Sequence, residues 1–552
     1  MPHKIISVII ILAISHFSVA QTSGDKELFA TFDSMLHKLF KPGGPGGTAL
    51  VSRQGNVIYK KAFGMADLEL NVPMQPDMIF RIGSITKQFT SVAILQLAEK
   101  GKLSLQDDIK KFIPDYPTQG YTITVEHLLT HTSGIKSYTG MPGFQSMMRK
   151  DMKPEEIIDV FKNEKMEFAP GSKWNYNNSG YILLGYIIEK VSGKAYEGYV
   201  TENLFMPAGM MHSAYGNESR IIKNRAKGYQ KNKDMYENAD YLSMTLPYAA
   251  GSLLSTVEDL WKWNQAIHSY KLLSKTFLEK AFAAYQLSNG KSTNYGYGWG
   301  VNPVQGSAAI EHGGGINGFL TDAIYLPAED VFVAVFSNCT CNSPDNTVLK
   351  MAALTIHKPY NYKEIAIDAV AAREYAGVYE TTEGEQRIIR AEKNKVTSQR
   401  GSGTPYRIIP FEKDKFFFET NDLITIQFSR DKSGKIEKLE YRSRTENNDW
   451  LKSSKPIPAE KTETKVDKTI LMSYAGEYEL MPGFTIQITV EDERIFAQAT
   501  NQGKNEIFPQ SESRFFLKVV DAQLEFFKGP DNKISHLVLY QGGQRMEGKK
   551  IK

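Results

Sequence analysis

The stretch FRIGSITKQFTSVAILQLAEKG, Phe80 to Gly101, places a serine and a lysine at the start of one helix. Apolar residues recur at helical spacing over positions 84–100, and a glycine ends the pattern. Ser84 and Lys87 are three residues apart, which puts both on one face of the first turn. A serine hydroxyl is a poor nucleophile until a base takes its proton, and a lysine held neutral by burial can be that base. The pattern therefore predicts a reactive serine.

The spacing Ser-x-x-Lys is weak when it is taken alone. It recurs in polar or glycine-containing segments that we expect to be loops, at Ser23, Ser133, Ser288 and Ser429. Ser84 is the one that starts an amphipathic helix, and a helix N-terminus favours a neutral lysine and leaves backbone N–H groups free for an oxyanion. The alternative is a serine that only caps a buried helix.

The segments that flank this helix predict an antiparallel sheet. GTALVSRQGNVIYKKAFGMAD, Gly47 to Asp67, alternates around a Gln-Gly-Asn turn and is typical of a β-hairpin. Helices and loops are predicted for most of the next two hundred residues, and a helix precedes the hairpin. Three strands follow late in the chain, at Ala308–Glu311, Ala323–Leu326 and Val331–Phe336. Strands at both ends with a helical insertion between them indicate an α+β domain.

The sequence after residue 360 contains two copies of one unit. EYAGVYE, Glu374 to Glu380, recurs as SYAGEYE, Ser473 to Glu479. Short alternating apolar runs and turns fill both copies, so each is expected to form an all-β barrel or sandwich. The expected domains are residues 27–357, then the two β repeats at 368–451 and 469–552.

A second stretch, PGSKWNYNNSGYILLGYIIEKVSG, Pro170 to Gly193, offers groups that could assist the serine. Tyr176 and Asn178 are two residues apart, so in an extended loop they point the same way, and a helix expected from about Ser179 would hold them. A tyrosine beside a cationic lysine can move protons, and an asparagine amide can position a substrate or the lysine. The alternative is a loop tyrosine that only packs on the domain.

The third stretch, EHGGGINGF, Glu311 to Phe319, follows a predicted strand, and its three glycines let a ligand approach the backbone closely. A phosphate loop is not indicated, because neither Gly-Lys-Ser/Thr nor a helix start follows. A metal site is a further alternative. The close histidine pair His127 and His131 lies in EHLLTHTSG, where the glutamate precedes both histidines instead of following the first. We therefore expect no metal and no other cofactor.

Three motifs in chain order carry a family resemblance: Ser84-Ile-Thr-Lys87, Tyr176-Asn-Asn178 and His312-Gly-Gly314. They resemble the serine β-lactamase and penicillin-binding-protein superfamily, most like its class C branch. LLTHTSG, AAGSLLSTVEDLWKW and YGYGWGV resemble that branch too, and the likeness covers about residues 27–357. It implies a five-stranded antiparallel sheet flanked by helices, with the active site between the sheet and the helical insertion.

The resemblance also implies a role for each motif residue. Ser84 would be the acylated nucleophile, Lys87 would activate it, and Tyr176 would be the general base and acid. Asn178, His312 and Gly314 would face and bind the substrate. The backbone N–H groups of Ser84 and Gly315 would form the oxyanion hole. These roles agree with the chemistry expected from the residues themselves.

One residue departs from the β-lactamase pattern. Where β-lactamases of this branch commonly carry lysine, this chain has His312, which is only partly charged near neutral pH. Histidine there, followed by two β domains, is more similar to secreted D-aminopeptidases. We therefore expect a serine hydrolase acting on amide or ester bonds of D-amino-acid peptides such as cell-wall fragments (a D-aminopeptidase or DD-carboxypeptidase-like enzyme), with an esterase, a β-lactamase or an acylation-only sensor as alternatives.

Composition and the N-terminus set the cellular context. MPHKIISVIIILAISHFSVAQ has a basic residue, an apolar run and small residues before Gln21, which predicts a signal peptide over residues 1–20 and export to the periplasm or exterior.

The net charge of +4 over 552 residues gives no nucleic-acid footprint, and no later segment predicts a membrane span. Cys339 and Cys341 are expected to be incidental, because cysteines so close rarely reach disulfide geometry. Nothing in the sequence sets the oligomeric state.

Overall fold

The computed structural model describes residues 23–552 apart from 402, 444–445, 460–462, 482, 501, 521 and 542–543. The chain divides into two compact units, residues 1–360 and 361–552. The signal peptide expected at residues 1–20 lies outside the described residues. Within the described part of the chain, no helix has both the length and the apolar character needed to cross a membrane.

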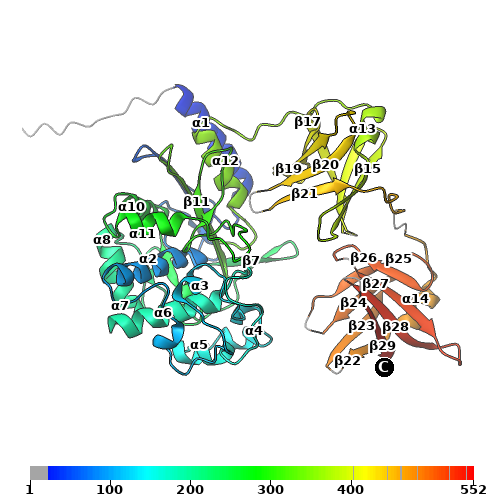
Figure 1. The fold of residues 1–552 in the computed structure, drawn as a ribbon, viewed down its shortest axis with the longest axis horizontal. Coiled ribbons are helices and arrows are strands. Elements are labelled where there is room, and N and C mark those ends of the chain that lie inside the picture. The colour runs from blue at the N-terminus through cyan, green and yellow to red at the C-terminus, as the bar shows by residue number, and fades with distance from the viewer. Residues whose placement is uncertain are drawn as a thin grey trace, which may run out of the picture. The chain divides into compact units, whose positions relative to one another are not determined.

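An antiparallel sheet of six strands, in the order β10-β11-β12-β13-β1-β2, forms the centre of the first unit (Figure 1). Its strands are β1 Gly47–Arg53, β2 Asn56–Phe63, β10 Gly300–Val301, β11 Ile310–Ile316, β12 Phe319–Leu326 and β13 Val331–Ser337. The early hairpin therefore pairs with the late strands, through β1 against β13. The α+β prediction is confirmed, and the two-residue β10 adds an edge strand to the five expected.

The glycine-rich stretch differs from the prediction. We expected the strand to end at Glu311, but β11 continues through all three glycines to Ile316 and pairs with β12 along its length. Strand pairing uses only backbone groups, so the absence of side chains at Gly313 to Gly315 does not interrupt it. The glycines are thus part of the sheet itself.

Helices cover the sheet and fill the segment between its two halves. They are α1 Ser23–Leu39, α2 Thr86–Glu99, α3 Val125–Leu129, α4 Phe144–Met147, α5 Pro154–Phe161, α6 Asn178–Ser192, α7 Tyr196–Val200, α8 Met206–Ala208, α9 Tyr248–Gly251, α10 Val257–His268, α11 Lys275–Phe282 and α12 Asp345–Thr355. α12 and α10 pack on the sheet, while α6 packs against α2 and α9. Ser23, expected in a loop, instead begins α1.

Among the described residues of the first unit, three small antiparallel sheets lie outside the main sheet, where the sequence indicated mostly helices and loops. They join β3 Met65–Asp67 to β4 Val72–Pro73, β7 Tyr229–Asn232 to β8 Met235–Asn238, and β9 Leu253–Ser255 to both β5 Phe80–Arg81 and β6 Ala214–Tyr215. The last of these matters for the site. It fixes the segment just before Ser84, because Arg81 pairs with Leu254 and the Ile82 N–H donates to the Leu253 carbonyl.

The second unit contains two closed barrels of eight strands each. The first, barrel 1, runs through β14 Gly377–Glu380, β15 Gln386–Glu392, β16 Lys395–Arg400, β17 Tyr406–Glu412, β18 Lys415–Phe418, β19 Asn421–Arg430, β20 Ile436–Arg442 and β21 Asn447–Lys452. The second, barrel 2, runs through β22 Gly476–Met481, β23 Phe484–Glu491, β24 Arg494–Ala499, β25 Asn505–Pro509, β26 Arg514–Leu517, β27 Ala522–Lys528, β28 Ile534–Gln541 and β29 Gln544–Lys550.

The two barrels repeat the same local structure, as the recurrent motif predicts. A short helix precedes each, α13 Ala369–Tyr375 and α14 Lys468–Tyr474. In barrel 1 the Tyr379 hydroxyl donates to the Tyr375 carbonyl at 2.7 Å, and in barrel 2 Tyr478 donates to Tyr474 at the same distance. Each tyrosine pair thus ties the helix to the first strand of its own barrel.

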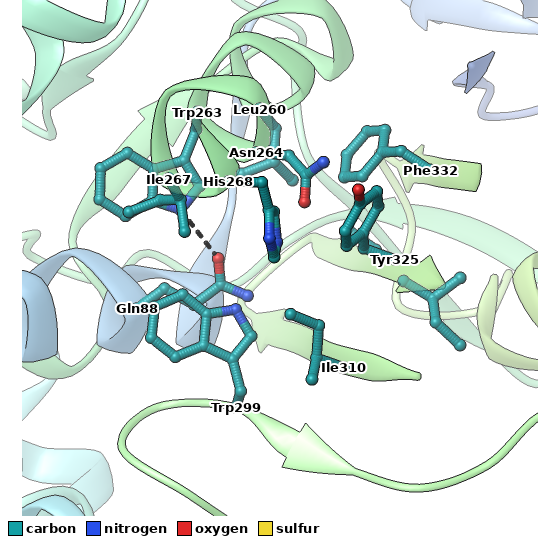
Figure 2. Close-up of a pocket in the computed structure, with 12 residues that line it drawn as sticks. Gln88, Leu260, Trp263, Asn264, Ile267, His268, Trp299, Ile310, Tyr325 and Phe332 are labelled. Carbon is teal, nitrogen blue, oxygen red and sulfur yellow. Dashed lines mark hydrogen bonds between the residues drawn. The ribbon is translucent and has the colours of Figure 1, made fainter. Parts of the chain in front are cut away.

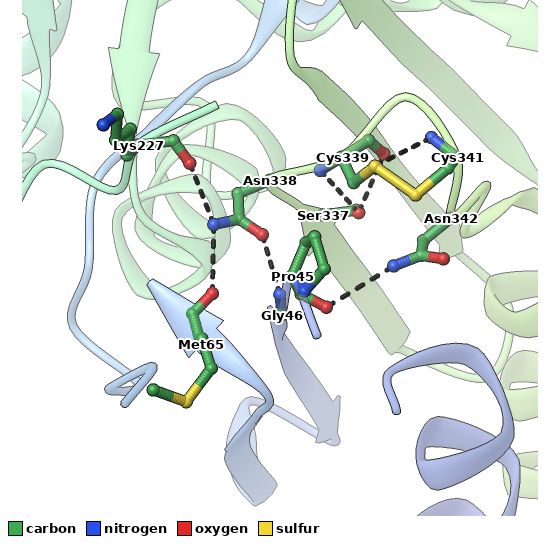
Figure 3. Close-up of a disulfide and its surroundings, with 9 residues drawn as sticks. All are labelled: Pro45, Gly46, Met65, Lys227, Ser337, Asn338, Cys339, Cys341 and Asn342. Atoms are coloured by element: carbon green, nitrogen blue, oxygen red, sulfur yellow. Dashed lines mark hydrogen bonds between the residues drawn. A yellow bond between two sulfur atoms is a disulfide. The ribbon is translucent and has the colours of Figure 1, made fainter. Parts of the chain in front are cut away.

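The cysteine prediction was wrong. Cys339 and Cys341 form a disulfide in the loop after β13, with their Cα atoms 5.1 Å apart (Figure 3). That distance lies inside the usual disulfide range, because the chain turns sharply between the two residues. The neighbouring Asn338 donates to the carbonyls of Met65 and Lys227 and accepts from the Gly46 N–H, so this loop holds three distant segments together.

Candidate active site

Ser84 lies in a 3-10 turn, Gly83–Ile85, that leads directly into α2. Lys87 is the second residue of α2, so the two side chains meet across one turn as the spacing predicts. The Lys87 Nζ atom lies 3.1 Å from the Ser84 Oγ atom. α2 is buried over most of its length, from Thr86 to Leu97, which fixes both side chains to the core of the domain.

Lys87 is completely buried and has no acidic partner among its hydrogen bonds. Besides Ser84, its Nζ atom contacts the Asn178 Oδ1 atom at 2.9 Å and the Ala250 carbonyl at 2.8 Å. Burial lowers the pKa of Lys87 well below its ordinary value, because a charged ammonium loses its hydration there. The structure therefore favours a neutral amine beside the serine.

Tyr176 lies over this amine, with its ring centroid 4.8 Å from Lys87 Nζ. Its hydroxyl is buried, and burial raises its pKa above the ordinary tyrosine value, although the Ser84 hydroxyl acts in the opposite direction. Tyr176 is therefore protonated over the physiological range.

Asn178 is the first residue of α6, and its amide bridges two elements. Its Oδ1 atom accepts from Lys87, and its Nδ2 atom donates to the Thr139 Oγ1 atom at 3.1 Å. Asn177 caps α6 by accepting from the Gly180 N–H, which anchors the helix start. The contact with Lys87 matches one of the two roles that the sequence allowed for Asn178, orientation of the lysine, and substrate positioning stays a prediction.

His312 lies on β11 and faces the same side chains. Its ring centroid is 6.2 Å from that of Tyr176, and its Nε2 atom is 2.9 Å from the Tyr295 hydroxyl. Its Nδ1 atom lies 2.6 Å from the Gly313 carbonyl, which can only accept, so Nδ1 carries the proton and Nε2 accepts from Tyr295. Burial, with a smaller effect of Lys87, lowers the pKa of His312 to about 3. The partly charged histidine that we expected is instead neutral.

The three glycines of β11 differ in what surrounds them. Gly313 and Gly315 are exposed, whereas Gly314 is buried. A Cβ atom on Gly314 would lie 2.0 Å from the Ile82 carbonyl oxygen, so only glycine fits there. Gly314 thus packs against the segment that leads to Ser84 instead of facing a substrate as expected. The Gly315 nitrogen lies 3.0 Å from the position of a Cβ on Gly83, which brings its N–H beside the serine turn.

A pocket of about 260 Å³ opens next to the serine. Ser84, Asn178 and Gly315 contribute to its wall, together with Gly83, Tyr138, Thr139, Phe144, Leu242, Leu246, Pro247, Ala250, Gly251, Ile316 and Asn317. None of these lining residues is acidic or basic. A group that enters this pocket therefore meets apolar side chains, hydroxyls and amides.

Two residues of this site were not assigned a role from the sequence. Tyr295 lies in YGYGWGV, a stretch noted only for its resemblance, and its hydroxyl donates a hydrogen bond to the Nε2 atom of His312. His131 was considered only as a metal ligand. Its ring packs against Tyr176 with centroids 4.3 Å apart, and its Nδ1 atom accepts from the Asn177 N–H. Tertiary contacts define both roles, and no spacing rule would have found them.

The other histidine of the suspected metal pair has a local task. His127 forms a capping box at the start of α3, where its N–H donates to the Thr124 Oγ1 atom and its Nδ1 atom accepts from the Thr124 N–H. Across the residues that the structure describes, no group of three or more His, Cys, Asp or Glu side chains is arranged to hold a metal ion.

A second, smaller cavity lies between α2, α10 and the sheet, and Figure 2 shows the residues around it. Its volume is about 20 Å³, which is space for about one water molecule. The Trp263 Nε1 atom donates to the Gln88 Oε1 atom at 3.1 Å across one side of the cavity. This cavity is too small for a substrate and belongs to the packing behind α2.

Comparison with known proteins identifies the family of this chain. Residues 31–358 match the family described as Beta-lactamase. The chain belongs to this family. The fold, the buried lysine beside a serine and this match together identify a serine hydrolase of the β-lactamase and penicillin-binding-protein type. Residues 460–550 match a separate domain of unknown function, DUF3471.

Three relatives show how far the similarity extends. Penicillin-binding protein 4* of Bacillus subtilis is 28% identical over 527 residues, which cover 92% of this chain and 95% of that protein. An octameric penicillin-binding protein homologue from Pyrococcus abyssi is 25% identical, with a TM-score of 0.54 over 87% of this chain and 99% of that one. A D-stereospecific amidohydrolase from a Streptomyces species is 26% identical, with a TM-score of 0.52 over 58% and 98%.

Proposed function

We propose that this chain, after export, hydrolyses amide bonds in D-amino-acid peptides such as cell-wall fragments, through an acyl-enzyme on Ser84. The observation that carries the proposal is the Lys87 amine, fully buried and 3.1 Å from the Ser84 hydroxyl. A neutral amine at that distance can take the serine proton as Oγ attacks the carbonyl carbon. A lysine on a protein surface is ordinarily charged and could not accept the serine proton.

The remaining steps use the residues around this pair. The N–H groups of Ser84 and Gly315 would stabilise the negative charge on the carbonyl oxygen of the tetrahedral intermediate. Tyr176, protonated because burial raises its pKa, would donate a proton to the departing amine nitrogen as the C–N bond breaks. Lys87, which carries the proton taken from Ser84, would then return it to the Tyr176 oxygen. In deacylation, a water molecule would attack the ester carbon as the Lys87–Tyr176 pair takes one of its protons. The pair would give a proton back to Ser84 Oγ as the ester C–O bond breaks, which releases the carboxylic acid product and regenerates the serine. The Asn178 side chain would hold Lys87 in position during both acylation and deacylation.

The electrostatics of the site support an amide substrate over a β-lactam. A substrate carboxylate is stabilised by a cation, but His312 is neutral and the pocket beside the serine has no charged side chain. A substrate that presents no free carboxylate at this position therefore fits better. Of the two peptidase activities expected, an aminopeptidase or amidase is favoured over a carboxypeptidase. The Streptomyces relative, named as a D-stereospecific amidohydrolase, is consistent with this preference.

A substrate panel tests the proposal. We expect turnover of D-alanine p-nitroanilide and of D-alanyl peptide amides, at least tenfold slower turnover of the L-enantiomers and of peptides ending in D-Ala-D-Ala, and little hydrolysis of nitrocefin. p-Nitrophenyl esters report whether the enzyme is mainly an esterase. A burst of product without steady turnover would identify an acylation-only sensor and contradict the proposal.

The nucleophile is tested separately with a fluorophosphonate probe. Ser84→Ala should lose both turnover and covalent labelling. Ser52→Ala is a control for the loss of a serine hydroxyl elsewhere in the same domain, because Ser52 is fully buried on β1, outside the site. Equal labelling of the Ser84 variant would exclude Ser84 as the nucleophile.

A further inference from the structure

Barrel 1 contains a buried arginine that its own barrel does not neutralise. Arg387, on β15, is 4% exposed. Its Nη1 atom donates to the Ser398 Oγ atom at 3.0 Å, but its buried Nε atom has no hydrogen-bond partner. Among the described residues, no carboxylate lies within ion-pair distance of this guanidinium. A buried charge without a counter-charge is costly, so its presence requires an explanation.

Aromatic rings surround the guanidinium. The Arg387 Cζ atom lies 4.5 Å from the ring centroid of Tyr441 and 5.0 Å from that of Trp450. Trp450 is fully buried, and its Nε1–H is a second buried donor without a partner. Cation–π contacts offset part of the desolvation cost but satisfy neither N–H group. Two unused donors and one positive charge thus lie in the same part of the barrel.

The nearest acidic side chains are already engaged. Glu385 and Glu446 both form ion pairs with Arg400, at 2.8 and 3.0 Å. Arg400 also lies near Trp450, with its Cζ atom 5.9 Å from the ring centroid. Burial is the largest influence on Arg387 and lowers its pKa to about 10, so the side chain stays charged at neutral pH.

Barrel 2 provides an internal comparison. Arg387 pairs with Arg400 across two strands of barrel 1, and the matching pair in barrel 2 is Ile486 with Ala499. By the same registers, Ser398 corresponds to Ala497 and Trp450 to Gly548. The same fold therefore closes with apolar or small residues at these positions, and a closed barrel of this type does not need the polar cluster.

We propose that the interior of barrel 1 binds a small oxyanion, a carboxylate or a phosphate, through the Nε side of Arg387 and the indole N–H of Trp450. Guanidinium groups bind both anions through paired N–H groups, and the free Nε edge offers that geometry. An anion there supplies the missing counter-charge and satisfies both buried donors. The site is separate from the serine and independent of the proposed hydrolase activity.

Thermal unfolding of the full chain in sodium phosphate or sodium hexanoate, at ionic strength kept constant with NaCl, tests this site. We expect a saturable rise of about 2–4 °C in the unfolding temperature of the second unit at about five times the dissociation constant. A response to phosphate identifies phosphate-type ligands, and a response to hexanoate identifies carboxylates with an apolar tail; either supports the site.

Three variants localise the response. Arg387→Ile installs the barrel 2 residue and should abolish it, while Arg387→Lys keeps the charge but loses the Nε donor and should weaken binding about tenfold. Arg494→Ile is the matched control, because Arg494 also lies over an aromatic ring but is exposed and paired with Glu506. Circular dichroism confirms that each variant folds. No saturable response to either anion, or an undiminished response in Arg387→Ile, would show that Arg387 only packs against the two rings.

Discussion

The Nε2 atom of His312 accepts a hydrogen bond from the Tyr295 hydroxyl at 2.9 Å, and both side chains are buried. Burial raises the pKa of Tyr295 well above the ordinary value and lowers that of His312 to about 3, so neither side chain carries charge at neutral pH. The pair therefore places no cation at this position of β11. Under the proposed function, a neutral residue here disfavours substrates that carry a carboxylate.

Replacing His312 with lysine should change that preference. We expect His312→Lys to raise kcat/KM for nitrocefin and other carboxylate-bearing substrates about tenfold, because a charge-assisted hydrogen bond to the carboxylate becomes available. Turnover of neutral amides should fall, because a cation near Lys87 opposes the proton uptake by which Lys87 activates Ser84. His312→Gln, which stays neutral, should show no gain. Without a gain in His312→Lys, the discrimination against β-lactams would have to come from the pocket wall.

The pH profile should report Lys87. Its folded pKa is lowered, so the neutral amine is the active form, and kcat/KM should fall as pH decreases through that pKa. The pKa of His312 is about 3, so the titration of His312 should not change kcat/KM near pH 6.5, the ordinary pKa of histidine. The measurement is kcat/KM against pH for the wild type and for His312→Gln. An acid limb near pH 6.5 that disappears in the variant would show that His312 titrates instead.

Adjacent glycines on β11 should tolerate alanine very differently. A Cβ at position 314 would lie 2.0 Å from the Ile82 carbonyl oxygen and 2.5 Å from Thr321 Oγ1, whereas at Gly313 the nearest atom is 3.5 Å away. Gly314→Ala should therefore lower the free energy of unfolding by about 1–3 kcal/mol and displace the serine turn, with large loss of activity. Gly313→Ala should keep wild-type stability. Thermal denaturation with activity on the same samples compares the two, and similar behaviour would contradict the close contact at Ile82.

The loop after β13 should depend more on Asn338 than on its disulfide. The disulfide closes only a three-residue loop, so its entropic contribution is about 1.5 kcal/mol. The Asn338 side chain forms hydrogen bonds with backbone groups of Gly46, Met65 and Lys227, and the loss of each contact costs about 0.5–1.5 kcal/mol.

Chemical denaturation of two variants tests this ranking. Asn338→Ala should reduce the free energy of unfolding more than the double variant Cys339→Ala/Cys341→Ala. A larger loss in the cysteine variant would mean that the covalent link, and not the amide, holds the loop.

Local patterns predicted the main sheet strands, the helix that follows Ser84 and the proximity of Ser84 and Lys87. Helical spacing places Ser84 and Lys87 on one turn wherever that helix packs, and the apolar strand patterns of the early hairpin and the late segments predict a sheet. The central strands β1 and β13 of that sheet are buried on both faces. The repeated tyrosine motif likewise predicts two similar β units. These inferences hold because a residue's neighbours in sequence fix its direction on a helix or strand.

The charge states of the site residues and the formation of the disulfide depended on the tertiary structure. The neutral His312 needs burial by Tyr176 and Tyr295, the neutral Lys87 needs a site without carboxylates, and the Cys339–Cys341 disulfide needs a sharp loop after β13. The sequence by itself determined which groups are available for chemistry. Only the tertiary structure decided their protonation, because desolvation and hydrogen bonding are set by the elements that surround each group.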